Sequence, residues 1–292
     1  MAVLRRLVDS RHRPALVVTP PDRPRGRGRR IASPPVAEAA SELGLDLLQT
    51  GSVNRPEAVQ GIRAAQPDLG LVCAFGQLIK DPLLTELEML NVHPSLLPRW
   101  RGAAPIERAI MAGDTETGVS IIKVTAGLDS GPIALQEPLE IREGEDHGSV
   151  SARLAEVGGG LVLRALDQRA EGRLEFSEQD DSFACYAEKV SPAERRLDSG
   201  RPAAELERTV RALNPHIGAY LELDGGERLG VRAARAEPGG ELKPGRLAAA
   251  DGALLLGCTP GALRLEAVQP QGRRPMTADA YLRGHALPSL ER

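Results

Sequence analysis

The chain has 292 residues, of which 41% are hydrophobic and 26% charged, the composition of a globular protein large enough for two domains. It contains no run of 18 apolar residues and no secretory signal at its start, so we expect a cytoplasmic protein without a membrane span. Its formal net charge of −3 is uneven, because residues 1–32 carry nine arginines against two aspartates, a local balance of +7. A basic segment on an acidic body is typical of a protein that contacts a polyanion at one place.

The first predicted element is an amphipathic helix over residues 1–10. The first predicted strand comes after it, at residues 15–19. A doubly wound α/β domain usually opens with a strand, so the lack of one before this helix is unexpected.

Short apolar runs then alternate with helical patterns as far as residue 170. The runs at 15–19, 69–75 and 89–93 are predicted strands buried on both faces. The segments 34–44 and 55–66 carry apolar residues at helical spacing, with proline near each start. This alternation predicts a doubly wound, Rossmann-like α/β sheet.

The second half of this region contains two strands and a long helix. The strands, at 117–125 and 131–141, are predicted to pair, and the helix follows them. The Gly158–Gly160 triple lies inside the helix, where glycine is unfavourable, so we expect it to weaken or bend the helix.

The remaining residues, from 176 onward, have a different sequence pattern. Residues 176–200 are polar and lack periodicity, which indicates a linker. After a helix at 202–215, short strands alternate with Gly- and Pro-bearing turns, the pattern of a small all-β barrel. The predicted organisation is an α/β domain over 1–175, a linker over 176–200 and a second domain over 201–292.

Two polar side chains with catalytic potential lie at the end of the predicted strand at 89–93. Its alternation places Asn91 and His93 on one side of the strand, and ligands of α/β sheets bind beyond the carboxyl ends of strands. An amide can donate to a developing oxyanion, and an imidazole can exchange a proton near neutral pH. Asp129, in a glycine-framed loop after the next strand, can orient the imidazole. With no serine or cysteine nucleophile nearby, the three suit direct acyl transfer to an amine.

Each of these residues has a simpler interpretation when taken alone. Asn91 or His93 could cap a turn, and Asp129 could bond its own backbone. Arg99 and Arg101 could form a solvated rim. Only the combination favours a catalytic site.

The segment 91–133 begins "NVHPSLLPRWRGAAPI" and ends "GLDSGPI", and it resembles the signature of folate-dependent formyltransferases. Its "RWRGAAPI" and "AGDTETGV" are most similar to the branch that acts on methionyl-tRNA. The resemblance covers nearly the whole chain, and residues 269–284 resemble the end of that family's oligonucleotide-binding (OB) barrel. It implies transfer of a formyl group from 10-formyltetrahydrofolate to the α-amino group of methionine on initiator tRNA.

The resemblance also implies a catalytic role for three residues. Asn91 would hydrogen-bond the formyl oxygen, and His93 would stabilise the oxyanion and share in proton transfer. Asp129 would fix the imidazole and assist removal of the proton from the attacking amine.

Two binding segments follow from the same resemblance. The folate-binding segment is Ser95, Leu96, Leu97 and Pro98. The loop that contacts the tRNA acceptor stem carries five arginines: Arg23, Arg25, Arg27, Arg29 and Arg30. The alternative is that this loop is disordered and its arginines are simply solvated.

Members of this family begin with a strand near the centre of the sheet, ahead of the helix that matches residues 1–10. We therefore expect the cellular protein to start upstream of Met1. The alternative is a fragment that is impaired because it has lost the first strand. No metal constellation is apparent, because His12, His147, His216 and His285 are scattered along the chain, and no metal is predicted. We expect a monomer without a membrane partner.

Two other functions remain open from the sequence. The chain could be another folate-dependent N-formyltransferase that acts on a small amine, which would need neither the arginine loop nor the C-terminal barrel. It could also be a catalytically impaired tRNA-binding protein.

Overall fold

The computed structural model describes residues 1–25, 30–239 and 242–290, and the chain divides into two compact units. Unit 1 comprises residues 1–103, 118–139 and 153–186, and unit 2 comprises 104–117, 140–152 and 187–292. Within the described ranges, no helix has the length and apolarity that a bilayer crossing requires.

The elements of unit 1 are mostly short. They are α1 (Ala2–Val8), β1 (Val17–Thr19), β2 (Arg23–Arg25), β3 (Arg30–Ala32), α2 (Pro35–Glu42), β4 (Leu47–Gln49), α3 (Pro56–Ala64), β5 (Gly70–Cys73), α4 (Leu83–Glu86), β6 (Met89–His93) and β7 (Arg101–Gly102). Four elements extend over both units: β8 (Glu116–Lys123), β9 (Ile133–Glu140), α6 (His147–Ala170) and β10 (Tyr186–Ala187).

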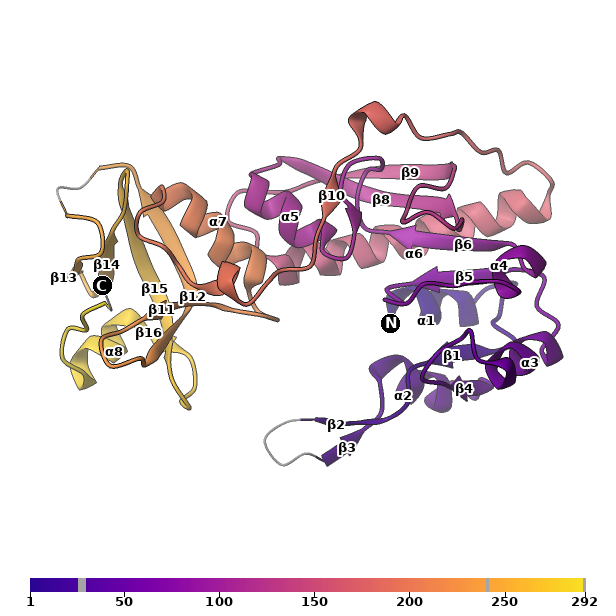
Figure 1. The fold of residues 1–292 in the computed structure, drawn as a ribbon, viewed down its shortest axis with the longest axis horizontal. Coiled ribbons are helices and arrows are strands. Elements are labelled where there is room, and N and C mark those ends of the chain that lie inside the picture. Colours follow the sequence, from indigo (N-terminus) through magenta and orange to yellow (C-terminus); the bar gives the residue numbers. More distant parts are fainter. Residues whose placement is uncertain (26–29, 240–241, 291–292) are drawn as a thin grey trace. The chain divides into compact units, whose positions relative to one another are not determined.

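The strands of unit 1 form two main sheets (Figure 1). One is the parallel pair β1–β4, and the other has the order β5–β6–β8–β9. In the larger sheet β5 and β6 are parallel, whereas β6 and β8 are antiparallel. The predicted Rossmann-like α/β architecture and the pairing of the strands near 117–125 and 131–141 are confirmed, and β4 is a strand that the sequence did not predict.

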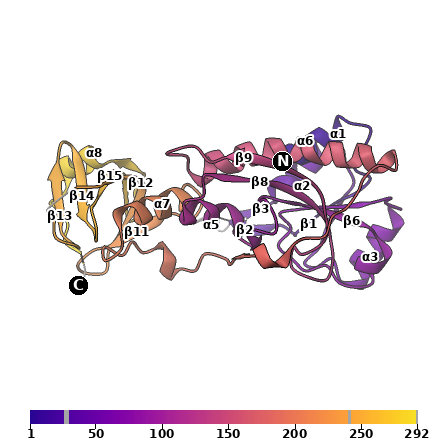
Figure 2. The ribbon, with the colours of Figure 1, turned by 90° about the horizontal axis from the view of Figure 1, so that it is seen from above.

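The long helix α6 lies along one face of the larger sheet (Figure 2). It runs through the Gly158–Gly160 triple as one continuous helix, so the expected weakening does not interrupt it. The reason is close packing: a Cβ on Gly158 would lie 3.2 Å from Val92 Cγ1 and 3.6 Å from Val119 Cγ1. Glycine there lets the helix approach β6 and β8, and this contact offsets its low helix propensity.

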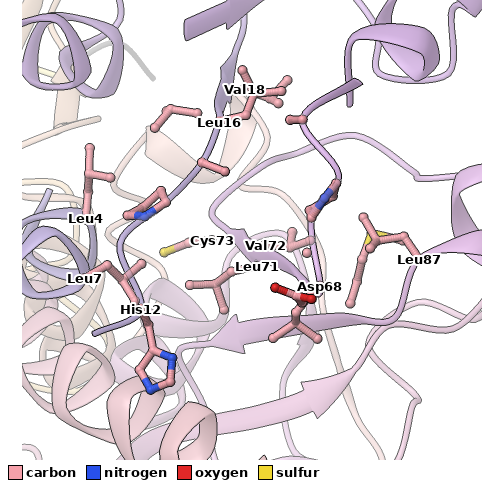
Figure 3. A pocket seen from close by; sticks show the side chains of 18 of the residues that line it. Leu4, Leu7, His12, Leu16, Val18, Asp68, Leu71, Val72, Cys73 and Leu87 are labelled. Atoms are coloured by element: carbon pink, nitrogen blue, oxygen red, sulfur yellow. The ribbon is translucent and has the colours of Figure 1, made fainter. Parts of the chain in front are cut away.

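A cleft of about 780 Å³ separates the two sheets of unit 1 (Figure 3). It is lined by β1 and β5, by Leu4 and Leu7 of α1, and by Met89 at the start of β6. Among the described residues β1 pairs only with β4, and β5 pairs only with β6. Each strand therefore presents an unpaired edge to an apolar cleft, where backbone N–H and C=O groups lack sheet partners.

Unit 2 is built on an antiparallel sheet. Its strands have the order β11–β12–β15–β14–β13, and β16 pairs with β15. Its elements are α5 (Pro105–Ala112), α7 (Ala203–Leu213), β11 (Ala219–Glu222), β12 (Arg228–Glu237), β13 (Leu247–Ala250), β14 (Ala253–Gly257), β15 (Ala262–Pro270), β16 (Met276–Thr277) and α8 (Ala278–Gly284).

The core of unit 2 lies between this sheet and its helices. Leu206, Val210 and Leu213 recur at helical spacing on α7 and are almost completely buried. They pack with alternating strand residues, such as Leu229 and Val231 of β12. The antiparallel strands agree with the all-β pattern of this part of the sequence.

Candidate active site

The strand β6 places Asn91 and His93 on one face of the larger sheet. Asn91 is opposite Ile122 of β8 in the register, and His93 is opposite Ser120. Residues two apart in a strand point to the same side, so both side chains project beside the loop that joins β8 to β9. The predicted spacing thus produces the predicted juxtaposition.

Asp129 lies in that loop with a positive φ of 47°. The loop is tight, because a Cβ on Gly131 would lie 1.8 Å from the Lys123 carbonyl oxygen. Only glycine fits at this approach. The close return of the chain turns Asp129 toward β6.

The three predicted catalytic side chains come together at this point. Asn91 Nδ2 donates to Asp129 Oδ1 at 3.2 Å, and the backbone N–H of Gly102 donates to Asp129 Oδ2 at 2.9 Å. His93 Nδ1 lies 3.6 Å from the same Oδ2. That distance is longer than a hydrogen bond but short enough for the carboxylate to stabilise a positive charge on the imidazole when the ring is protonated.

The hydrogen bonds of His93 define its neutral tautomer. Its Nε2 lies 2.9 Å from the Trp100 carbonyl oxygen, which can only accept, so Nε2 carries the proton. Nδ1 of the neutral ring is then an acceptor that faces Asp129. The residue is only 4% exposed, and burial lowers the pKa of His93 below its ordinary value, although Asp129 and the Trp100 carbonyl oppose this effect. Burial thus favours the neutral form of the imidazole, which lies next to the Asp129 carboxylate.

The predicted folate-binding segment, residues 95–98, is held rigidly by two polar side chains. Ser120 Oγ donates to the Ser95 carbonyl at 2.7 Å and accepts from the Leu97 N–H at 3.1 Å. Gln136 Nε2 donates to the Leu97 carbonyl at 2.9 Å and to Ser120 Oγ at 2.8 Å. Ser95 and Leu97 are buried, whereas Leu96 and Pro98 remain half-buried. The segment is therefore a fixed support with part of its apolar surface accessible.

Arg101 and Gln179 support the site, and sequence reasoning missed both. Arg101 is 3% exposed, so the solvated-rim interpretation is wrong for it. Its guanidinium donates twice to Gln179 Oε1, at 3.0 and 2.8 Å, and pairs with Asp181 at 2.7 Å. Gln179 Nε2 in turn donates to the carbonyls of Asp129 and Gly131, at 2.8 and 2.7 Å. A buried arginine requires such partners, and the polar "SEQDD" stretch that supplies them was the only signal.

The arginine-rich segment forms part of a separate hairpin. β2 and β3 are antiparallel, with Arg23 opposite Ala32, and the hairpin extends away from the neighbouring α2 (Figure 1). Arg23 is exposed. Arg27 and Arg29 lie outside the described residues, as do the side chains of Arg25 and Arg30.

Comparison with known proteins identifies the family. The model "Formyl transferase" matches residues 2–166, and "Formyl transferase, C-terminal domain" matches residues 189–286. The chain is 42% identical over 286 residues to a protein of Methylococcus capsulatus named methionyl-tRNA formyltransferase, a match that covers 97% of this chain and 93% of the relative. A protein of Methylobacillus flagellatus with the same name is 42% identical over 288 residues, covering 97% of this chain and 92% of the relative.

A solved structure supports the fold over the same length. WlaRD, a sugar 3N-formyl transferase, superposes with a TM-score of 0.66 and covers 94% of this chain and 94% of its own, at 13% identity. Both family domains are matched, and the alignments to the relatives cover nearly the full chain at 42% identity. The chain belongs to the formyl transferase family.

Proposed function

We propose that this protein transfers the formyl group of 10-formyltetrahydrofolate to the α-amino group of methionine on initiator tRNA. The observation that carries the proposal is the gathering of Asn91, His93 and Asp129 at the end of β6. The names of the relatives, which align over nearly the full chain, support the choice of acceptor.

Asn91 is suited to the developing oxyanion. Its amide has two N–H groups, and the hydrogen bond to Asp129 uses one of them. The other can donate to the formyl oxygen as the carbon becomes tetrahedral. The bond to Asp129 fixes the orientation of the amide before the substrate arrives, which is the preorganisation that makes such donors effective.

His93 and Asp129 are suited to moving the proton. The amine nitrogen attacks the formyl carbon, a new C–N bond forms, and the bond from that carbon to the folate nitrogen breaks. Nδ1 of neutral His93 can accept the proton that the amine loses, and Asp129 at 3.6 Å stabilises the imidazolium. The proton then passes to the departing folate nitrogen, so the imidazole returns to its neutral form.

The segment Ser95–Pro98 is suited to the folate. Ser120 and Gln136 bind the backbone N–H and carbonyl of Leu97, so the segment is already fixed. The half-buried Leu96 and Pro98 can therefore offer apolar contact to the folate without further rearrangement. 10-Formyltetrahydrofolate supplies the activated one-carbon unit when bound. Holding formyl carbon and amine in line can contribute about 7–11 kcal/mol to the rate acceleration.

Binding of tRNA is assigned to the arginine-rich hairpin and to the C-terminal region. Arg23, Arg25, Arg27, Arg29 and Arg30 would contact phosphates through their guanidinium groups. We assign residues 1–175 to catalysis, 176–200 to a linker and 201–292 to an OB-like tRNA-binding domain. A monomer in the cytoplasm, without a membrane partner, completes the proposal.

A formyl-transfer assay tests the function. The purified chain is incubated with formyl-labelled 10-formyltetrahydrofolate and, in separate reactions, methionyl initiator tRNA, methionyl elongator tRNA, free methionine or an amino sugar. The proposal predicts that label appears in methionine mainly from the charged initiator tRNA. Label in the small amines alone would support the alternative acceptor class, and tRNA binding without transfer would indicate an impaired enzyme.

A further inference from the structure

Three ionisable side chains of unit 2 meet although they are far apart in the sequence. Glu107 lies in the first turn of α5, His147 begins α6, and His216 follows α7. The sequence alone showed scattered histidines, and only the fold brings two of them to one carboxylate.

The geometry of this Glu–His–His cluster is compact. His216 Nε2 lies 2.9 Å from Glu107 Oε1, and His147 Nε2 lies 3.8 Å from the same oxygen. The two imidazole rings stack with centroids 3.7 Å apart and planes 25° apart. One candidate ligand atom from each residue lies within 4.8 Å of the others.

These separations match the requirements of a metal centre. Two ligand atoms at 2.0–2.1 Å from a tetrahedral zinc lie about 3.3 Å apart. The separations of 2.9 and 3.8 Å to Glu107 fall on either side of that value. The two rings stack, so they would have to rotate until both Nε2 lone pairs converge, and three donors would then face one ion.

The backbone around the cluster is fixed by hydrogen bonds. Asn214 Nδ2 donates to Asp146 Oδ2 at 2.8 Å, and the Gly148 N–H donates to the Asn214 carbonyl at 3.3 Å. Arg211 NH1 donates to the Glu145 carbonyl at 2.9 Å. These contacts tie the start of α6 to the end of α7, so they hold the two histidines beside each other.

The chemical surroundings also suit a metal ligand. Glu107 and His147 are largely buried, whereas His216 is more exposed and leaves a path from solvent. Two imidazoles with one carboxylate form a donor set that zinc uses.

We propose that Glu107, His147 and His216 form a binding site for a divalent transition metal of the zinc class. Such an ion would link α5, α6 and the segment after α7 and would stabilise unit 2. The site shares no residue with Asn91, His93 and Asp129, so the proposal stands independently of the formyl-transfer reaction.

Metal titration of the untagged full chain tests the site. Zinc binding is measured by calorimetry after dialysis against a chelator, and cobalt substitution is followed by visible absorption. We expect one equivalent of zinc, a rise in melting temperature that the chelator reverses, and a cobalt spectrum without thiolate charge transfer. The last feature excludes binding by Cys73, Cys185 or Cys258.

Variants identify the ligands. Glu107→Gln, His147→Gln and His216→Gln should each weaken zinc binding at least about tenfold, because each removes one of three donors. The matched control is His285→Gln, which changes another unit 2 histidine that stacks on an aromatic ring, Tyr281. His216→Gln changes the most exposed member and should keep the metal-free melting temperature. The proposal is overturned if zinc does not bind stoichiometrically, or if binding persists unchanged in these variants.

Discussion

Asn91 Nδ2 donates to Asp129 Oδ1 at 3.2 Å across a sequence separation of 38 residues. The bond joins the end of β6 to the β8–β9 loop, and it is possible because β6 and β8 are neighbours in the sheet. The same carboxylate lies 3.6 Å from His93 Nδ1. One loop residue thus organises both the proposed oxyanion donor and the proposed proton carrier.

Replacing Asn91 by alanine should reduce kcat about 10²–10³-fold and leave folate affinity nearly unchanged. The reason is that a single oxyanion donor stabilises the transition state much more than the bound substrate. Steady-state kinetics with varied 10-formyltetrahydrofolate measures both quantities. Asn54→Ala is the control, since Asn54 is another asparagine of unit 1 whose amide donates a hydrogen bond, in this case to the Leu78 carbonyl. An equal loss of kcat in both variants would contradict the assigned role.

Replacing Gln179 by leucine should lower both stability and turnover. It leaves the buried Arg101 without one acceptor and frees the backbone of Asp129 and Gly131. Loss of a buried hydrogen-bond partner costs about 1–3 kcal/mol of unfolding free energy, and more where a charge is involved.

Urea unfolding gives the stability change, and kinetics separates kcat from KM. We expect kcat to fall while the folate KM stays close to wild type, because Gln179 acts through the position of Asp129. Gln77→Leu, at a half-buried glutamine whose side chain donates to the Gly51 carbonyl, is the control. A Gln179 variant with lower stability but wild-type kcat would show that the residue has no positioning role.

The pH dependence of stability should reveal the buried His93. Burial lowers its pKa in the folded chain, so between that lowered value and the ordinary value of about 6.5 the unfolded chain binds more protons. Stability attributable to this residue is therefore present above about pH 6.5 and declines as the pH falls below it. The melting temperature of wild type should drop more steeply toward acid pH than that of His93→Gln. Parallel curves for the two proteins would mean that His93 titrates as it does in the unfolded chain.

The cleft between β1 and β5 should accept an additional strand. A designed apolar strand of about six residues, joined ahead of Met1, can reach it because Met1 itself lines the cleft. Each apolar side chain that becomes buried contributes about 1.5–3 kcal/mol, and each kcal/mol raises the melting temperature by roughly 2–4 °C in a domain of this size.

The thiol of Cys73 provides a second measurement for this prediction. It is exposed and lines the cleft, so an inserted strand should slow its reaction with a thiol reagent. The control extension has the same length but carries two prolines, which lack N–H groups and cannot complete a ladder. Equal melting temperatures and labelling rates for both extensions would exclude strand insertion.

Local sequence patterns predicted much of the fold and part of the site. The alternation in β6 predicted the side shared by Asn91 and His93, and the glycine-framed turn predicted the loop of Asp129, because both depend on short-range geometry. Apolar periodicity likewise predicted α2, α3 and α7.

Features that depend on distant contacts were not predictable in this way. Gly158 packs against Val92 in a continuous α6, whereas the sequence pattern alone predicted a helix weakened or bent by its glycine triple. Arg101 and Gln179 are 78 residues apart, so their pairing is determined only when the chain folds. The same is true of Glu107, which is 109 residues from His216.

The single-turnover rate of formyl transfer by Asp129→Asn tests whether Asn91, His93 and Asp129 act together in catalysis. This change keeps the size of the side chain but removes the charge beside His93. We expect the rate to fall by about 10²–10⁴-fold, the usual contribution of proton transfer, while the affinities for tRNA and folate stay at wild-type values. A variant that transfers the formyl group at the wild-type rate would contradict this joint role.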